Sequence, residues 1–225
     1  MSSKNKLRRF AENLTFDNLF QLNYHELQQG FPLKGKWKEE HFKNNGEIVL
    51  ELGCGKGEYT TGLAERYPER NFIGVDIKGA RMYVGLKYAR EHKLDNVAFI
   101  RTRINLIGMC FGPAEISEIW ITFPDPQPRE SKIRKRLTSS NYLRYYAGFL
   151  KPDGIIHLKT DNIIVYEDTL DLIRDEGHDL LFSTDDVYAQ KLDNELTQIQ
   201  TYYEKKWLDY GTRIKYLSFK LKNNE

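Results

Sequence analysis

The sequence predicts an α/β fold, namely a mainly parallel sheet of seven strands with helices on both faces. From residue 47 onward, short apolar and β-branched runs alternate with longer stretches whose apolar residues recur every three or four positions. Strands joined by helices pair in parallel, because the helix carries the chain back across the sheet. Near the C-terminus two strand-like runs follow each other without a long helix between them. These two runs predict an antiparallel pair at one edge of the sheet.

The expected elements follow in chain order. Strands are expected at residues 47–52, 71–77, 97–101, 118–123, 154–160, 178–188 and 214–221. Helices are expected at residues 57–68, 79–92, 139–150 and 162–177. The first of these helices ends at Pro68, which cannot continue it. Residues 1–45 are polar and charged with little periodicity, and therefore predict a partly ordered basic arm before a single domain that spans residues 46–225.

Composition narrows the class of protein. With 225 residues, of which 40% are hydrophobic, the chain is long enough for one substantial core. The net charge of +2 does not by itself indicate a nucleic-acid-binding protein, so any basic surface must come from local clustering. Cys54 and Cys110 fit neither a metal-ligand spacing nor a disulfide framework. Without a signal peptide or an apolar run of about 20 residues, the chain is expected to be soluble and cytoplasmic, with no metal and no membrane partner.

A glycine-rich turn follows the first expected strand. Gly53, Gly55 and Gly57 allow a sharp turn and a close approach to a ligand that faces the helix N–H groups, although an ordinary strand-to-helix connection has the same pattern. Asp76 ends the next strand about 20 residues later, where a carboxylate can accept hydrogen bonds from a ribose. Glu51 precedes the glycines and would repel a pyrophosphate. It suits the ammonium and sulfonium charges of S-adenosylmethionine instead.

These residues carry a first resemblance. The pattern E-x-G-x-G-x-G, followed by an acidic residue at the end of the next strand, resembles the class I S-adenosylmethionine-dependent methyltransferases. The resemblance implies a Rossmann-like fold and S-adenosylmethionine as cofactor. It does not indicate a substrate.

The stretch "TFPDPQPRESKIRKRL", residues 122–137, places an acid beside a basic cluster. It follows the strand expected at 118–123, and ligands of open α/β sheets bind outside the carboxyl ends of the strands. Pro124 and Pro126 restrain Asp125, which is predicted to face the reacting centre, unless it only caps the loop or pairs with the basic run. That run is either solvated surface or a contact for RNA phosphates. Its members are Arg129, Lys132, Arg134, Lys135 and Arg136.

A narrower resemblance covers the chain from about residue 47 to the end. "FPDP", a basic segment ending in "KRL", a later "KTDN" and "TYYEKKWLDYGTRIKYLSFKL" are similar to the bacterial tRNA (guanine-N7)-methyltransferases. The resemblance implies methylation of guanine 46 in the variable loop of tRNA. It places the cofactor site at Glu51, Gly53, Gly55, Gly57, Asp76 and Asp125, with Asp125 also catalytic. It places substrate contacts at Arg129, Asp161, Thr201, Tyr203 and Glu204. From the charge of the basic run we expect phosphate contacts at Lys132, Arg134, Lys135 and Arg136.

The chain departs from that family at two places. In the loop, a tryptophan and a histidine of the family are absent, while positive charge is retained at Arg129 and Lys132. After the third strand the family has Asp-Ala, whereas this chain has "RTRINL". Asn105 is the polar residue expected there to contact the adenine of the cofactor, through its amide.

The expected chemistry needs no general base, because guanine N7 has a lone pair and carries no proton. Catalysis then consists of alignment, together with a carboxylate that stabilises the charge developing on the purine. Asp125 and Asp161 are the expected carboxylates, and Thr201 and Glu204 the residues that hold the guanine edge. Two alternatives remain, a methyltransferase for a small molecule or a protein, and a non-catalytic RNA-binding module. The sequence leaves both a monomer and a homodimer open.

Overall fold

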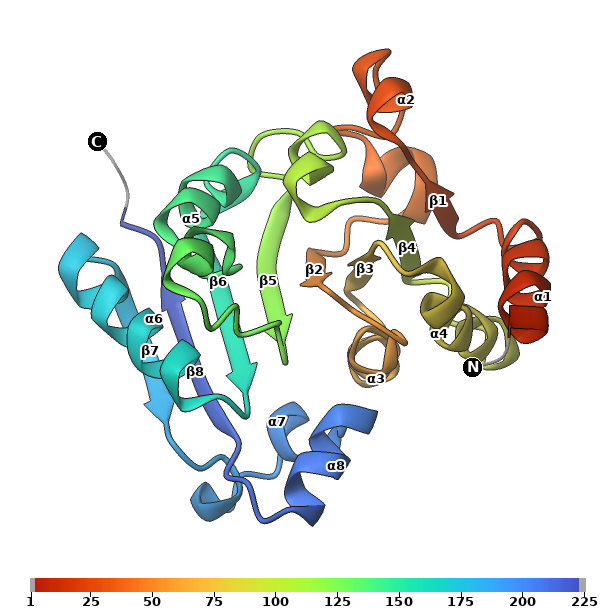
Figure 1. Ribbon diagram of the computed structural model, residues 1–225. Helices are drawn as coiled ribbons and strands as arrows, with labels where there is room; N and C mark the ends of the chain where they lie inside the picture. Colours follow the sequence, from red (N-terminus) through yellow and green to blue (C-terminus); the bar gives the residue numbers. More distant parts are fainter. Residues whose placement is uncertain (1–2, 223–225) are drawn as a thin grey trace. The chain divides into compact units, whose positions relative to one another are not determined.

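The computed structural model describes residues 3–222 and divides into two compact units, with the boundary between Gly112 and Pro113. The described residues contain eight strands, four in each unit, joined mostly by helices (Figure 1). No helix among them is long and apolar enough to pass through a membrane.

Four parallel strands form the sheet of the first unit, in the order β1-β4-β3-β2. They are β1 (Leu19–Gln21), β2 (Ile48–Leu52), β3 (Asn71–Asp76) and β4 (Val97–Arg101). The helices α3 (Glu58–Arg66) and α4 (Gly79–Glu91) pack against β3 and β4, and a 3-10 helix, η2 (Ile104–Met109), follows β4. All five residues of β2 are buried, which explains why its sequence is almost continuously apolar.

The segment before residue 46, expected to be a partly ordered arm, contributes several elements to this unit. They are α1 (Ser3–Asn13), β1, α2 (Tyr24–Gln28) and a π-helix, η1 (Trp37–Phe42). Helix α1 lies along α4 (Figure 1), where the Asn13 side chain donates to the Gly79 carbonyl at 2.9 Å. Trp37 is fully buried, and its indole donates to the Cys110 carbonyl at 3.0 Å. Strand β1 raises the number of strands from the seven expected to eight.

In the second unit the strand order is β5-β6-β8-β7, with a parallel β5–β6 pair and antiparallel β6–β8 and β8–β7 pairs. The strands are β5 (Ile116–Thr122), β6 (Leu150–Thr160), β7 (Asp179–Thr184) and β8 (Lys215–Lys220). The predicted mainly parallel fold with an antiparallel C-terminal edge is therefore confirmed. Thr122 pairs with Lys159, so β5 and β6 end at the same edge.

Helical segments connect these strands. They are η3 (Glu130–Lys135), α5 (Ser140–Tyr146), α6 (Ile163–Glu176), η4 (Tyr188–Gln190), α7 (Glu195–Gln198) and α8 (Tyr202–Asp209). Figure 1 shows α7 and α8 beyond the arrowhead of β6. Tyr146 of α5 and Phe149 after it belong to the core, since each is at most 1% exposed. His157 is likewise a core residue that stacks on Trp120 with 3.9 Å between ring centroids.

One glycine of the first unit is required by packing as well as by conformation. Gly57 caps α3 with φ of 74°, and a Cβ there would lie 2.6 Å from the Phe99 ring and 3.3 Å from the Gly85 Cα. Phe99 is fully buried and has no space to retreat. The strand-to-helix turn is therefore closed tightly by β4 and α4.

We predict that Gly57→Ala lowers the free energy of unfolding by about 2–4 kcal/mol, since left-handed strain and overpacking add. Gly53→Ala is the matched control, because Gly53 has a similar φ of 78° but open space within 4 Å of the added Cβ. Strain alone should cost the control about 1–2 kcal/mol. Urea titration of both variants measures the difference, and equal losses would contradict the packing explanation.

Candidate active site

The glycine turn of the first unit lies at the carboxyl end of β2. The backbone N–H groups of Gly53 and Cys54 both donate to the Val75 carbonyl of β3, at 2.8 and 3.0 Å. Gly53, Gly55 and Gly57 all have positive φ, which folds the backbone sharply into α3. The turn therefore exposes main chain rather than side chains at the end of the strand, as a site for a closely bound ligand requires.

Two carboxylates hold this turn. Glu51 is 3% exposed and accepts hydrogen bonds from the Thr60 N–H at 2.9 Å and from the Thr60 hydroxyl. Asp76, half-buried at the end of β3, accepts from the Gly55 N–H at 2.9 Å and from the Lys78 N–H at 2.7 Å. Each Asp76 oxygen thus has one bond from the main chain and can accept another from a ligand hydroxyl. The sequence-predicted acids and glycines of this unit are brought together.

A cavity of about 470 Å³ opens beside Asp76, at the carboxyl ends of β1 and β4. Its walls include Ile77, Thr102 and Arg103, and the segment from Gln21 to Glu26. Thr102 is 4% exposed, and its hydroxyl oxygen is buried without a hydrogen-bond partner. An unpaired buried hydroxyl costs about 1–3 kcal/mol, so this atom fits a site that a polar ligand completes. A hydroxyl group without a partner, close to the Asp76 carboxylate, suits the nucleoside end of a cofactor.

Asn105, the sequence-based choice for adenine, is the second residue of η2 and is exposed. It does not line the cavity, whereas Thr102 and Ile77 do. Sequence reasoning passed over Thr102 although a signal was present. Thr102 is the first residue after the carboxyl end of β4, as Gly53 is the first residue after β2.

In the second unit, Asp125 lies in the loop after β5. Its side chain is exposed and accepts a hydrogen bond from the Gln127 N–H at 3.1 Å, which closes a turn. Phe123 and Gln127 both have positive φ, so the loop reverses sharply on either side of the acid. The loop begins with a bond from the Phe123 N–H to the Lys159 carbonyl at 2.8 Å. Asp125 is therefore held by the main chain at the edge where β5 and β6 end.

The basic run divides into exposed and buried members. Arg129, Arg134 and Lys135 are exposed and Lys132 is half-buried. Arg136 is 6% exposed, donates to the Pro126 carbonyl at 2.8 Å and forms an ion pair with Asp168 of α6. The buried cation of the run thus pairs with α6 rather than with Asp125, and it fastens the loop to that helix.

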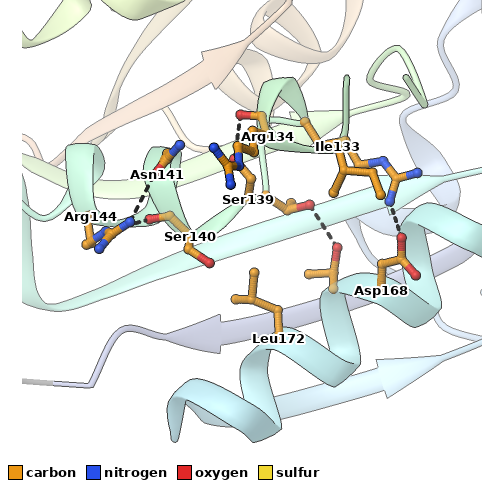
Figure 2. Close-up of a pocket in the computed structure, with 11 residues that line it drawn as sticks. Ile133, Arg134, Ser139, Ser140, Asn141, Arg144, Asp168 and Leu172 are labelled. Atoms are coloured by element: carbon orange, nitrogen blue, oxygen red, sulfur yellow. Dashed lines mark hydrogen bonds and ion pairs between the residues drawn. The ribbon is translucent and has the colours of Figure 1, made fainter. Parts of the chain in front are cut away.

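A second cavity, of about 340 Å³, lies between the end of this run, α5 and α6. Figure 2 shows Arg134 and Arg144 on one side of it, and Asp168 and Leu172 of α6 on the other. Arg144 donates to the Asn141 side chain at 2.8 Å and is exposed. Because Asp168 is already paired with Arg136, Arg134 and Arg144 give the cavity a positive wall. Arg144 was missed in the sequence, where it is surrounded by core aromatic residues.

Asp161 follows β6 directly, at the same edge as the Asp125 loop. It is half-buried, and burial raises the pKa of its carboxyl group, although Lys215 and a main-chain hydrogen bond act in the opposite direction. The Lys215 ammonium donates to the Asp161 carbonyl at 3.3 Å. Asp125 and Asp161 therefore follow two neighbouring parallel strands that end in register.

The start of α8 contains the last predicted residues. Thr201 caps the helix and accepts from the Glu204 N–H at 3.2 Å, while Tyr203 is 41% exposed. Glu204 is fully buried, and its carboxylate forms an ion pair with Lys159 at 2.7 Å. Of these three residues, Tyr203 alone is exposed. Among residues 3–222, no group of three or more His, Cys, Asp and Glu side chains is placed to hold a metal ion.

The fold is similar to that of solved methyltransferases. The crystal structure of the 16S rRNA methyltransferase KamB matches with a TM-score of 0.60 and 14% identity, covering 90% of this chain and 95% of that one. An aminoglycoside resistance methyltransferase, NpmB1, matches with a TM-score of 0.56 and 17% identity, covering 90% and 95%. At such identities the likeness concerns the Rossmann-like fold alone.

Sequence comparison is more specific. Residues 45–217 match the family model described as "Putative methyltransferase". A tRNA (guanine-N(7)-)-methyltransferase of Christiangramia forsetii is 53% identical over 224 residues, covering 99% of this chain and 100% of the relative. One of Bacteroides thetaiotaomicron is 47% identical, covering 97% and 86%. The chain therefore belongs to the family of the tRNA (guanine-N(7)-)-methyltransferases.

Proposed function

We propose that this protein transfers the methyl group of S-adenosylmethionine to N7 of guanine 46 in the variable loop of tRNA. The observation that carries this proposal is the identity of 53% to a tRNA (guanine-N(7)-)-methyltransferase along essentially the whole chain. The proposed site of action is the cytoplasm. Residues 46–225 act as one catalytic domain, to which residues 1–45 are an N-terminal extension.

The cofactor is assigned to the carboxyl ends of β2, β3 and β4. Glu51 and Asp76 hold the ammonium and the ribose, and Gly53, Gly55 and Gly57 let the main chain approach. Asn105 and Thr102 are the polar residues proposed for adenine, and Thr102, whose buried hydroxyl has no partner, lines the cavity beside Asp76. When bound, S-adenosylmethionine supplies an electrophilic methyl group on a positively charged sulfur.

Asp125 is proposed to contact the cofactor and to act in catalysis. Guanine N7 needs no base, so the protein has only to orient the ring and to stabilise the positive charge that it gains. The Asp125 carboxylate is held by the Gln127 N–H before substrate arrives, so little reorganisation is required. Asp161 is the second carboxylate proposed for the guanine, and it must be ionised to act in this way.

Thr201, Tyr203 and Glu204 are proposed as the guanine-binding segment. The exposed ring of Tyr203 offers a surface for stacking, and Thr201 fixes the helix start from which it projects. Glu204 belongs to the same turn, with its carboxylate directed toward Lys159.

The tRNA backbone is assigned to the basic run and its neighbours. Arg129, Lys132, Arg134 and Lys135 have accessible side chains that suit phosphate contacts. Arg134 and Arg144 line the cavity shown in Figure 2, which has the size and the charge for a phosphate group and its sugar. Arg136, sequestered by Asp168, supports the loop and contributes to phosphate binding by holding it.

The function is tested with unmodified tRNA and labelled S-adenosylmethionine, followed by nucleoside analysis and mapping of the labelled position. Wild type should form 7-methylguanosine at position 46. Asp125→Asn should lower the single-turnover rate by a factor on the order of 10², because the charge but not the shape is removed, with tRNA affinity nearly unchanged. A different labelled nucleoside would refute the function. An Asp125→Asn rate equal to that of wild type would reduce Asp125 to a loop residue.

Thr102→Val is predicted to have opposite effects on stability and on cofactor binding. Without cofactor the melting temperature should rise by about 2–4 °C, since an unpaired buried hydroxyl is replaced by a methyl group of similar size. Affinity for S-adenosylmethionine should fall about threefold to tenfold because a hydrogen bond to the ligand is lost. Thr102→Ser keeps the hydroxyl and is the control for affinity. Equal dissociation constants for wild type and Thr102→Val would exclude the hydroxyl from the cofactor site.

The basic run is tested by the salt dependence of tRNA binding. Arg129→Ala/Lys132→Ala should weaken binding and flatten the log–log salt dependence by about one unit for each lost contact, with cofactor affinity unchanged. Lys87→Ala/Arg174→Ala removes two exposed cations from α4 and α6 and is the matched control. If both double variants give the wild-type slope, the RNA is held elsewhere.

A further inference from the structure

Lys159 is a fully buried lysine near the carboxyl end of β6. Its ammonium lies 2.7 and 2.9 Å from the two oxygens of Glu204 and 2.7 Å from the Leu196 carbonyl. A longer bond of 3.4 Å reaches the Ile199 carbonyl. One side chain of the sheet therefore binds the end of α7 and the first turn of α8.

A tyrosine completes this cluster. The Tyr188 hydroxyl donates to Glu204 at 2.8 Å and accepts from the Gln200 side chain at 3.0 Å. Burial lowers the pKa of Lys159, and the Glu204 carboxylate opposes that shift. Removal of the carboxylate alone would leave a buried charge without compensation, and so would removal of the ammonium.

The main chain of Lys159 has a separate role at the same edge. Its carbonyl accepts from the Phe123 N–H at 2.8 Å, which is the bond that begins the Asp125 loop. Asp161 follows two residues later in the chain. Lys159 thus joins, by backbone or by side chain, the segments that carry Asp125, Asp161 and Tyr203.

A buried ion pair contributes little net stability, because desolvation offsets the attraction, and well-packed apolar residues often serve the fold as well. Such a pair instead fixes the relative position of the two elements that carry its charges. Helices α7 and α8, of four and eight residues, are too short to hold themselves in place. Their position therefore depends on tertiary contacts, and the ion pair with Lys159 is one of these contacts.

We propose that Lys159 is a positioning residue for methyl transfer, whose ammonium holds Glu204 so that the start of α8 presents Tyr203 and Thr201 to the guanine. This inference rests on the proposed function. According to this proposal, Glu204 acts through its bond to Lys159, and the ring of Tyr203 contacts the base. Nothing in the reacting centre itself needs to change when Lys159 is replaced.

The test compares four variants by tRNA kinetics, cofactor affinity, melting temperature and hydrogen exchange of residues 195–209. Lys159→Met keeps the length of the stem and removes the charge. It should raise KM for tRNA about tenfold or more and increase exchange in 195–209, with S-adenosylmethionine affinity within about twofold of wild type. Lys220→Met, at the opposite end of the same sheet, is the matched control and should behave as wild type.

Two further variants separate positioning from a general loss of structure. The double variant Lys159→Met/Glu204→Gln should melt above Lys159→Met, because no unpaired charge is left, yet its KM should stay high. Tyr188→Phe removes only the hydroxyl that binds Glu204, so it gives a folded protein even if Lys159→Met does not fold. It should raise KM for tRNA by about twofold to fivefold with little change in melting temperature.

The experiment distinguishes a wrong positioning role for Lys159 from a wrong assignment of the methyltransferase function. Wild-type KM and exchange in both Lys159→Met and Tyr188→Phe would overturn the positioning role while leaving the methyltransferase intact. A KM restored in the double variant together with its melting temperature would also overturn it, because stability alone would then explain the loss. If wild type methylates no tRNA, the function and this inference fall together.

Discussion

Parallel pairing brings the carboxyl ends of neighbouring strands together, and four of the acidic residues proposed for the site, Glu51, Asp76, Asp125 and Asp161, lie at such an end or just after it. In the first unit, Glu51 lies on β2 in register with Gly74 of β3, and Asp76 ends β3. In the second unit, Asp125 and Asp161 follow β5 and β6, which end with Thr122 opposite Lys159. Beyond the carboxyl end of a strand, the backbone N–H groups no longer form hydrogen bonds to the neighbouring strand. They can then donate to carboxylates and orient them. Asp76 and Asp125 are both held in that way.

The residues at the carboxyl ends of the strands in the two units differ in whether their polar atoms already have hydrogen-bond partners. The carboxylates of Glu51, Asp76 and Asp125 already accept hydrogen bonds from the chain, so their orientation exists before any ligand binds. The Thr102 hydroxyl has no partner, although Thr102 is 4% exposed. A protein that keeps an unpaired polar atom gives up stability, which is reasonable where a ligand supplies the bond. The cavity beside Asp76 is the place where this exchange is possible.

Most of the fold could be predicted because its signals are local in the chain. The runs at 48–52 and 97–101 are apolar except for one charged residue each, the glycine turn is contiguous in the sequence, and no long helix separates the last two strands. Strand β1 has only three residues and no periodicity, so its pairing with β4 could not be anticipated. The sequence also did not show which charged side chains would be buried. Glu204 and Arg136 find partners 45 and 32 residues away, and a sequence does not reveal contacts over such distances.

Burial also divides the charges of this protein into two kinds with different physical roles. Arg136 and Lys159 are both buried and paired, with Asp168 and Glu204, and each pair fastens a loop or short helix to a larger element. Arg129 and Arg134 are exposed and act in water, where charge interactions are screened by salt. Arg134 and Arg136 are two residues apart, but salt should weaken the contribution of the first to RNA binding far more than that of the second. A run of basic residues is therefore not one binding surface. Its buried member gives the loop a fixed shape, and this shape sets where the exposed members meet phosphate.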